Sequence, residues 1–136
     1  MMVYDDWNII QKLFTAQVGS TRKDLLKNLK DIEFPGLQNY APGLKVERKV
    51  TYESATQMFI IDVKLNNTMG TKITVWFVKG ELVIRVGDLY SYRKNMENLC
   101  CLNEATVFKC TNSSKTEDLQ NNIDEKFMKF TDFIRL

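Results

Sequence analysis

The fold is decided by residues 58–86, which read MFIIDVKLNNTMGTKITVWFVKGELVIRV. Apolar residues alternate with polar ones in three runs of this segment, which is the period of a half-buried strand. The runs are separated by a five-residue turn, Asn66–Gly70, and by a two-residue turn, Lys79-Gly80. Both lengths are typical of hairpins. The segment therefore predicts three antiparallel strands, over residues 58–65, 72–77 and 81–86.

The strand pattern continues on both sides of this segment. Residues 44–53 alternate in the same way and predict a preceding strand with one wet face, while residues 105–110 are a candidate fifth strand. Gly87-Asp88 is expected to break the sheet, and the sequence does not decide whether residues 87–110 are helix, strand or loop. The apolar face of the sheet is predicted to consist of Val46, Val50, Phe59, Ile61, Val63, Ile73, Val75, Phe77, Leu82 and Ile84.

Helical spacing precedes the strands. A first helix is expected with Asp5 or Asp6 as its cap, followed by a second helix that opens with the capping box Thr21–Asp24. The second helix is predicted to end at Pro35-Gly36, because proline lacks the donor that continues a helix. The apolar stripes of the two helices are Trp7, Ile10, Leu13 and Phe14, and Leu25, Leu26, Leu29 and Ile32.

Helical spacing also returns after the strands. Apolar residues recur at intervals of four, four, three and four, which draws one continuous stripe. These residues are Leu119, Ile123, Phe127, Phe130 and Ile134. The sequence therefore predicts a single α+β domain over residues 1–136. It has two N-terminal helices, a four- to five-stranded antiparallel meander and a C-terminal amphipathic helix packed on the sheet.

The composition narrows the classes of function. Of 136 residues, 44% are hydrophobic and 26% charged, as in ordinary globular proteins. Nineteen Lys and Arg stand against seventeen Asp and Glu, a net charge of +2 that lacks the basic stripe of nucleic-acid-binding proteins. There is no histidine, which excludes Ser-His-Asp and Cys-His chemistry and all histidine-containing metal sites.

Cysteine usage and the N-terminal residues point to a compartment. Cys100, Cys101 and Cys110 form neither a disulfide framework nor a Cys-x-x-Cys zinc motif, so free thiols in a reducing compartment are expected. The acidic residues Asp5 and Asp6 stand where a signal peptide carries basic ones, and no apolar run is long enough to span a membrane. A cytoplasmic or nuclear location is the expectation.

Three groups of residues are candidates for chemistry or binding. Paired carboxylates perform acid–base catalysis when they converge, and Asp62 stands out because apolar residues flank it. Aromatic residues interleaved with basic ones stack single-stranded bases or dock proteins. The glycines form no phosphate-binding loop, so no nucleotide cofactor is expected. The carboxylates are Glu53, Asp62 and Glu81, and the candidate partner-binding residues are Trp76, Tyr90, Tyr92, Arg93, Phe127 and Phe130.

Residues 59–92 also resemble the sheet of the plant ribosome-inactivating N-glycosidases. The likeness rests on the runs at 72–75, 82–84 and 87–90, about a quarter of the chain. That family places an adenine-stacking tyrosine where this chain has Leu82-Val83, and its Glu-Ala-Ala-Arg-type catalytic helix is absent here. The resemblance implies an inactive relative of about half the family's length.

The leading hypothesis is a non-enzymatic protein–protein interaction module, either an adaptor or a self-associating subunit such as a dimer. It needs no cofactor and no metal. The alternatives are a domain that binds single-stranded nucleic acid across its sheet, the inactive N-glycosidase relative, and an enzyme that uses carboxylates and tyrosine. Affinity for an oligonucleotide at two salt concentrations separates the first two, because phosphate contacts impose a steep salt dependence.

We predict that all three cysteines of the folded protein titrate as free thiols. A reducing compartment does not maintain structural disulfides, and an odd number of cysteines always leaves one unpaired. Thiol titration and intact mass under non-reducing conditions measure this. A mass lower by two hydrogens would reveal an intramolecular disulfide and contradict the compartment assignment.

Overall fold

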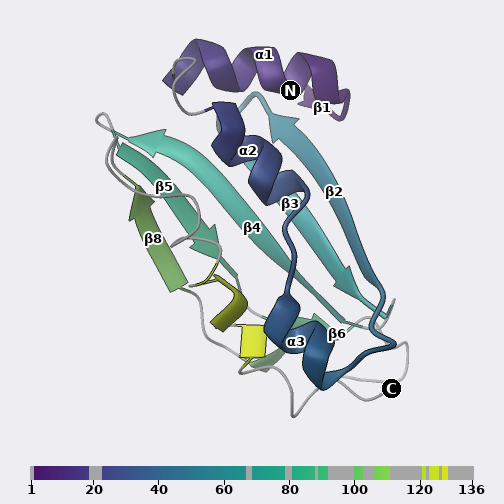
Figure 1. Cartoon of the computed structure of the whole chain (residues 1–136). Helices are drawn as coiled ribbons and strands as arrows, with labels where there is room; N and C mark the ends of the chain where they lie inside the picture. The colour runs from purple at the N-terminus through teal and green to yellow at the C-terminus, as the bar shows by residue number, and fades with distance from the viewer. Residues whose placement is uncertain are drawn as a thin grey trace.

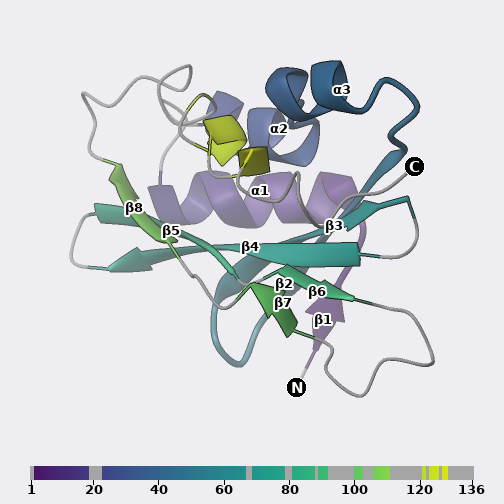
Figure 2. The ribbon, with the colours of Figure 1, turned by 90° about the horizontal axis from the view of Figure 1, so that it is seen from below.

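The computed structural model describes residues 2–18, 23–66, 69–78, 81–87, 89–91, 100–102, 106–110, 121, 123–125 and 127–128. They form an antiparallel sheet with the described helices on one side of it (Figures 1 and 2). The predicted α+β class is confirmed.

The sheet has the strand order β1-β2-β3-β4-β5-β8, and β6 joins it by pairing with β4 and β7. Neighbouring strands are antiparallel throughout, so the predicted meander and its fifth strand are confirmed. The bounds are β1 (Val3–Tyr4), β2 (Val46–Glu53), β3 (Met58–Leu65), β4 (Met69–Val78), β5 (Glu81–Val86), β6 (Leu89–Ser91), β7 (Cys100–Leu102) and β8 (Thr106–Cys110).

The connection between β3 and β4 is shorter than the five residues predicted. Met69 pairs with Leu65 and Gly70 with Lys64, so the ladder takes in two residues that the pattern assigned to the turn. Asn66 makes the reversal with a φ of 54°, in the left-handed region that asparagine tolerates better than most residues. The shorter connection therefore lengthens β4, which begins at Met69, whereas β3 keeps its predicted bounds.

Gly87 redirects the chain without ending the sheet, which corrects the predicted break. Its N–H donates to the Lys72 carbonyl at 2.9 Å, and its carbonyl accepts from the buried Thr71 hydroxyl at 3.0 Å. A Cβ at this position would lie 3.3 Å from the Lys72 carbonyl oxygen, a closeness that favours glycine. β6 then resumes pairing with the start of β4.

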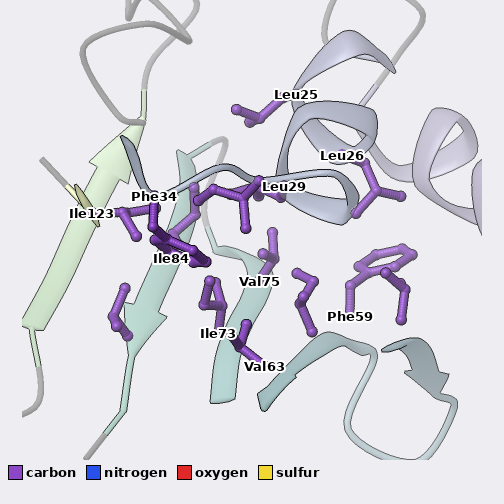
Figure 3. Close-up of a cluster of buried hydrophobic side chains, with 14 of the residues drawn as sticks. Leu25, Leu26, Leu29, Phe34, Phe59, Val63, Ile73, Val75, Ile84 and Ile123 are labelled. Atoms are coloured by element: carbon purple, nitrogen blue, oxygen red, sulfur yellow. The ribbon is translucent and has the colours of Figure 1, made fainter. Parts of the chain in front are cut away.

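The predicted inward face is confirmed by the register. Ile61 of β3 pairs with Val50 on one side and Ile73 on the other, and both Ile61 and Val75 are 0% exposed. Figure 3 shows these strands meeting side chains from the helical layer. Phe77 is the exception: it is 41% exposed at the end of β4, so the buried face stops short of it.

Two of the helices confirm their predicted stripes. α1 (Trp7–Val18) is capped by Asp6, whose Oδ1 accepts the N–H of Asn8 at 2.9 Å and of Ile9 at 3.4 Å. α2 (Lys23–Lys30) follows, and the capping residue Thr21 lies outside the described residues. Both helices bury apolar residues against the sheet, among them Ile10, Phe14, Leu25, Leu26 and Leu29.

The role predicted for Pro35-Gly36 is wrong. α2 ends at Lys30, and Pro35 opens a further helix, α3 (Pro35–Tyr40). Proline is well suited to the first turn of a helix, because the N–H it lacks has no partner there in any case. The same property that stops one helix therefore starts the next.

The C-terminal segment closes over this short helix. Its described residues are helical at 121, 123–125 and 127–128, and Ile123 and Phe127 are fully buried. The Phe127 ring lies 4.3 Å from that of Phe34, and Asp124 accepts the Gly36 N–H at 3.1 Å. The prediction that this helix packs over the sheet is confirmed for these residues, while Phe130 and Ile134 lie outside them. Across the described segments, no helix is long and apolar enough to cross a membrane.

We predict that Phe127→Ala lowers the free energy of unfolding by about 3–5 kcal/mol, the usual cost of emptying a buried aromatic site. Met128→Ala is the matched control, because the neighbouring Met128 is 36% exposed and its truncation should cost less than about 1 kcal/mol. Chemical denaturation of both variants measures the difference. Equal stabilities would contradict the packing of this helix, and a Phe127→Ala variant that stays stable but changes its oligomeric state would make the helix a partner-binding element.

Candidate interaction surface

The sheet formed by β2 to β5 has one face toward the described helices and one face away from them. We call the second of these the outer face. Figure 2 shows the described helices gathered on the opposite side of the sheet. Because successive side chains of a strand alternate, the outer face takes every second residue of each strand. It carries Glu47, Lys49, Thr51 and Glu53 from β2, Met58, Ile60, Asp62 and Lys64 from β3, Lys72, Thr74 and Trp76 from β4, and Val83 and Arg85 from β5.

One end of the outer face is apolar. Trp76 pairs with Val83, and Ile60 lies on the neighbouring strand beside them. Met58 pairs with Glu53, whose other neighbour is Val3 of β1, 60% exposed. We call Val3, Met58, Ile60, Trp76 and Val83 the apolar band. Val83 is itself buried, at 7% exposed, so the accessible part of the band is made by the other four residues. The wet side of an antiparallel sheet is usually polar, so this band is a candidate contact surface.

The other end of the outer face is a ladder of alternating charges. Asp62 pairs with Lys49 on one side and Lys72 on the other, and Glu47 pairs with Lys64. Opposite charges facing each other across strands stabilise a sheet by about 0.2–1 kcal/mol per pair. This pairing explains how Asp62 is accommodated beside apolar neighbours. The basic residues it faces also favour a structural role over a catalytic one.

A hollow lies at this charged end. Its volume is about 340 Å³, and it is lined by Glu47, Arg48, Lys49, Asp62 and Lys64. The described residues of the lining are three cations and two carboxylates, and none of them is an aromatic residue of the kind that holds a drug-sized organic ligand. The hollow is therefore a poor match for an apolar small molecule.

Glu53 and Asp62, the two predicted carboxylates whose side chains are described, do not converge. Glu53 pairs with Met58 at one end of β3, whereas Asp62 lies four residues along the same strand. A strand rises about 3.3 Å per residue, so the two positions are roughly 13 Å apart, beyond the separation of paired acid–base carboxylates. Glu53 instead accepts a hydrogen bond from Thr56 at 3.1 Å. The side chain of Glu81 lies outside the described residues.

Metal ligands do not gather in the part of the chain that the structure describes. No group of three or more Cys, Asp or Glu residues there is arranged to hold an ion. Cys100 and Cys101 begin β7 and Cys110 ends β8, but their side chains are not among those described. The cysteine prediction therefore remains a prediction.

The predicted partner-binding residues do not form one cluster. Trp76 is half-buried on the outer face, whereas Tyr90 pairs with Gly70, six residues away along β4, or roughly 20 Å. Tyr92, Arg93 and Phe130 lie outside the described residues. Full burial removes Phe127 from the accessible surface and from the candidate contact set.

Several residues of the apolar band escaped the sequence-based prediction. Met58 and Ile60 sit at alternate positions to the buried residues of β3, so this strand is apolar on both sides. That pattern is typical of a central strand. It is also the feature of the sequence from which a second contact face could have been predicted. Val3 gave no signal, because a two-residue strand has no detectable period.

No known protein family, no curated protein and no solved structure matches this chain. The resemblance to ribosome-inactivating N-glycosidases therefore gains no support from these comparisons. The functional assignment rests on the surface itself.

Proposed function

We propose that the protein is a non-enzymatic interaction module that binds a protein partner through the apolar band of its outer face. The observation that carries the proposal is the position of Trp76. It is half-buried, it pairs with Val83, and it lies next to the strand of Met58 and Ile60 on the side of the sheet that the described helices leave uncovered. Tryptophan is the residue type most enriched among those that dominate binding energy.

The layout of the outer face supports a protein partner. The apolar band offers a surface that gains free energy when water is removed from it, at about 25 cal/mol per Å². Beside it, Lys49, Asp62 and Lys72 form a ladder of alternating charges, which orients a partner that carries complementary charges. An apolar centre with a charged margin is the usual composition of a protein–protein interface.

Single-stranded nucleic acid is the competing partner on the same face. Trp76 and Arg85 are suited to stacking and phosphate contacts. However, Lys49, Lys64 and Lys72 alternate with Glu47, Glu53 and Asp62, and these carboxylates repel a phosphate backbone. The mixture of positive and negative charges on the outer face therefore favours a protein partner over single-stranded nucleic acid. Three cysteines without a disulfide framework fit the cytoplasm or nucleus as the setting.

We predict that Trp76→Ser reduces the recovery of the bound partner by about tenfold or more, the usual effect of losing a dominant interface residue. The measurement is affinity capture from the native source on the immobilised chain, with nuclease treatment and quantitative mass spectrometry. Tyr40→Ser is the matched control, because Tyr40 is an aromatic residue that is 58% exposed on α3 in the helical layer.

The outcomes separate the hypotheses. Partner loss with Trp76→Ser but not with Tyr40→Ser, at an unchanged melting temperature, supports the outer face. Equal recovery with both variants contradicts it. Recovery that nuclease abolishes, with a steep dependence on salt, would assign the surface to nucleic acid instead.

A further inference from the structure

Strand β2 is an edge of the sheet over most of its length. β1 pairs with it only at Tyr52 and Glu53, and no other strand of the described chain pairs with residues 46–51 on that side. Figure 1 shows β2 along the rim of the sheet. An unpaired strand edge presents a row of N–H and C=O groups that another strand can join.

Hydrogen bonds at the two ends of β2 show which residues direct their backbone N–H and C=O groups toward the open edge. Ser54 donates its N–H to Met2 at 3.0 Å, toward the open edge, while Lys45 accepts from Asn66 at 2.9 Å, toward β3. Backbone groups alternate in direction along a strand, so even-numbered residues of β2 face the edge. The edge-directed positions are therefore Val46, Arg48 and Val50. The Val46 carbonyl already accepts a long hydrogen bond from Arg48 Nη1 at 3.4 Å, and its second lone pair remains for a partner strand.

We propose that two copies of the chain pair along this edge, antiparallel, around a twofold axis at Arg48. In that register Arg48 faces Arg48 of the second copy, and Val46 and Val50 face each other, so every edge-directed residue meets another. The arrangement allows six backbone hydrogen bonds by the antiparallel pattern of about two per bonded pair. On the outer face, Glu47 meets Lys49 of the second copy twice.

Charge selects this register over its alternatives. Centring the axis on residue 47 brings Glu47 against Glu47, and centring it on residue 49 brings Lys49 against Lys49. Centring it on Val50 places Arg48 against Tyr52, whose edge is already paired with Tyr4. A twofold axis placed between two residues would pair even-numbered residues with odd-numbered ones, so that groups directed to the edge would face groups that point toward β3. An axis at Val46 also brings Glu47 against Lys45, but it pairs Arg48 with Leu44, which precedes β2 and whose N–H already donates to the Ala41 carbonyl at 2.9 Å. The axis at Arg48 therefore combines unlike charges with edge groups that all belong to the strand.

Arg48 itself does not obstruct the pairing. Its side chain turns toward the helical layer, where Nε donates to the Ile32 carbonyl and Nη2 lies 3.5 Å from the Glu33 carboxylate. The guanidinium is therefore neutralised before a second copy approaches. Dimerisation would place two outer faces side by side in one sheet. The inference specifies a mode of self-association for the proposed interaction module. It rests on the β2 edge and shares with the outer face only the side chains of Glu47 and Lys49, which lie at the end away from Trp76.

The test is sedimentation of the full chain over about 1–300 μM, because an interface of five paired residues is small and its dimer weak. The wild-type chain should form a dimer. Lys49→Glu and Glu47→Lys should each weaken it by about tenfold to a hundredfold, because each makes both cross-copy pairs repulsive. An equimolar mixture of the two variants should restore a 1:1 dimer, since lysines on one copy then face glutamates on the other.

Lys72→Glu is the matched control, because Lys72 lies on the outer face of β4, away from this edge, and the change should leave the dimer intact. Melting temperatures establish that each variant is folded. A wild-type chain that stays monomeric, single variants that still dimerise, or a mixture that does not, would each overturn the proposal. If the dimer fails while capture still depends on Trp76, only this inference falls and the proposed function stands.

Discussion

The structure depends on the need to cover one apolar face of a meander. β3 is paired on both sides, and its Phe59, Ile61 and Val63 form a fully buried row. A row of this kind cannot remain wet without promoting aggregation, so the helices pack on it. The C-terminal segment takes part through Phe127, which stacks on Phe34, and through Asp124, which holds the start of α3. Segments about 90 residues apart thus form one layer.

Because the described helices gather on one side, the opposite side of the sheet and the β2 edge are two surfaces that the described chain offers to partners. The outer face combines an apolar band around Trp76 with a charge ladder through Asp62. The edge offers unpaired backbone groups flanked by Glu47 and Lys49. Under twofold symmetry, Glu47 of one copy faces Lys49 of the other. Docking centres on Trp76 and self-association on the β2 edge, at opposite ends of the outer face, so one chain is able to do both at once.

The parts of this arrangement that follow from short-range sequence patterns could be predicted from the sequence. β3 has the predicted bounds, and Asp6 caps α1 as expected, because alternation and capping act over a few neighbouring residues. The prediction that Pro35 ends a helix is wrong, because proline is common both in the first turn of a helix and just after the end of one, and the sequence alone does not distinguish the two. The apolar band was not predicted as a unit, since it joins residues of four strands through register. Arg48 falls at an inward position of β2, and its partners Ile32 and Glu33 are only recognisable in the fold.

The most direct test of this two-sided sheet compares Ile60 with Ile61, which are adjacent in β3 but point to opposite sides. Ile61 is 0% exposed beneath the helices, whereas Ile60 is half-buried on the outer face. Isoleucine methyl spectra recorded with a soluble paramagnetic probe measure the access of each side chain to solvent. The account predicts strong broadening for Ile60 and protection for Ile61 and Ile73. Broadening of Ile61 equal to that of Ile60, or complete protection of Ile60 in the free protein, would contradict it.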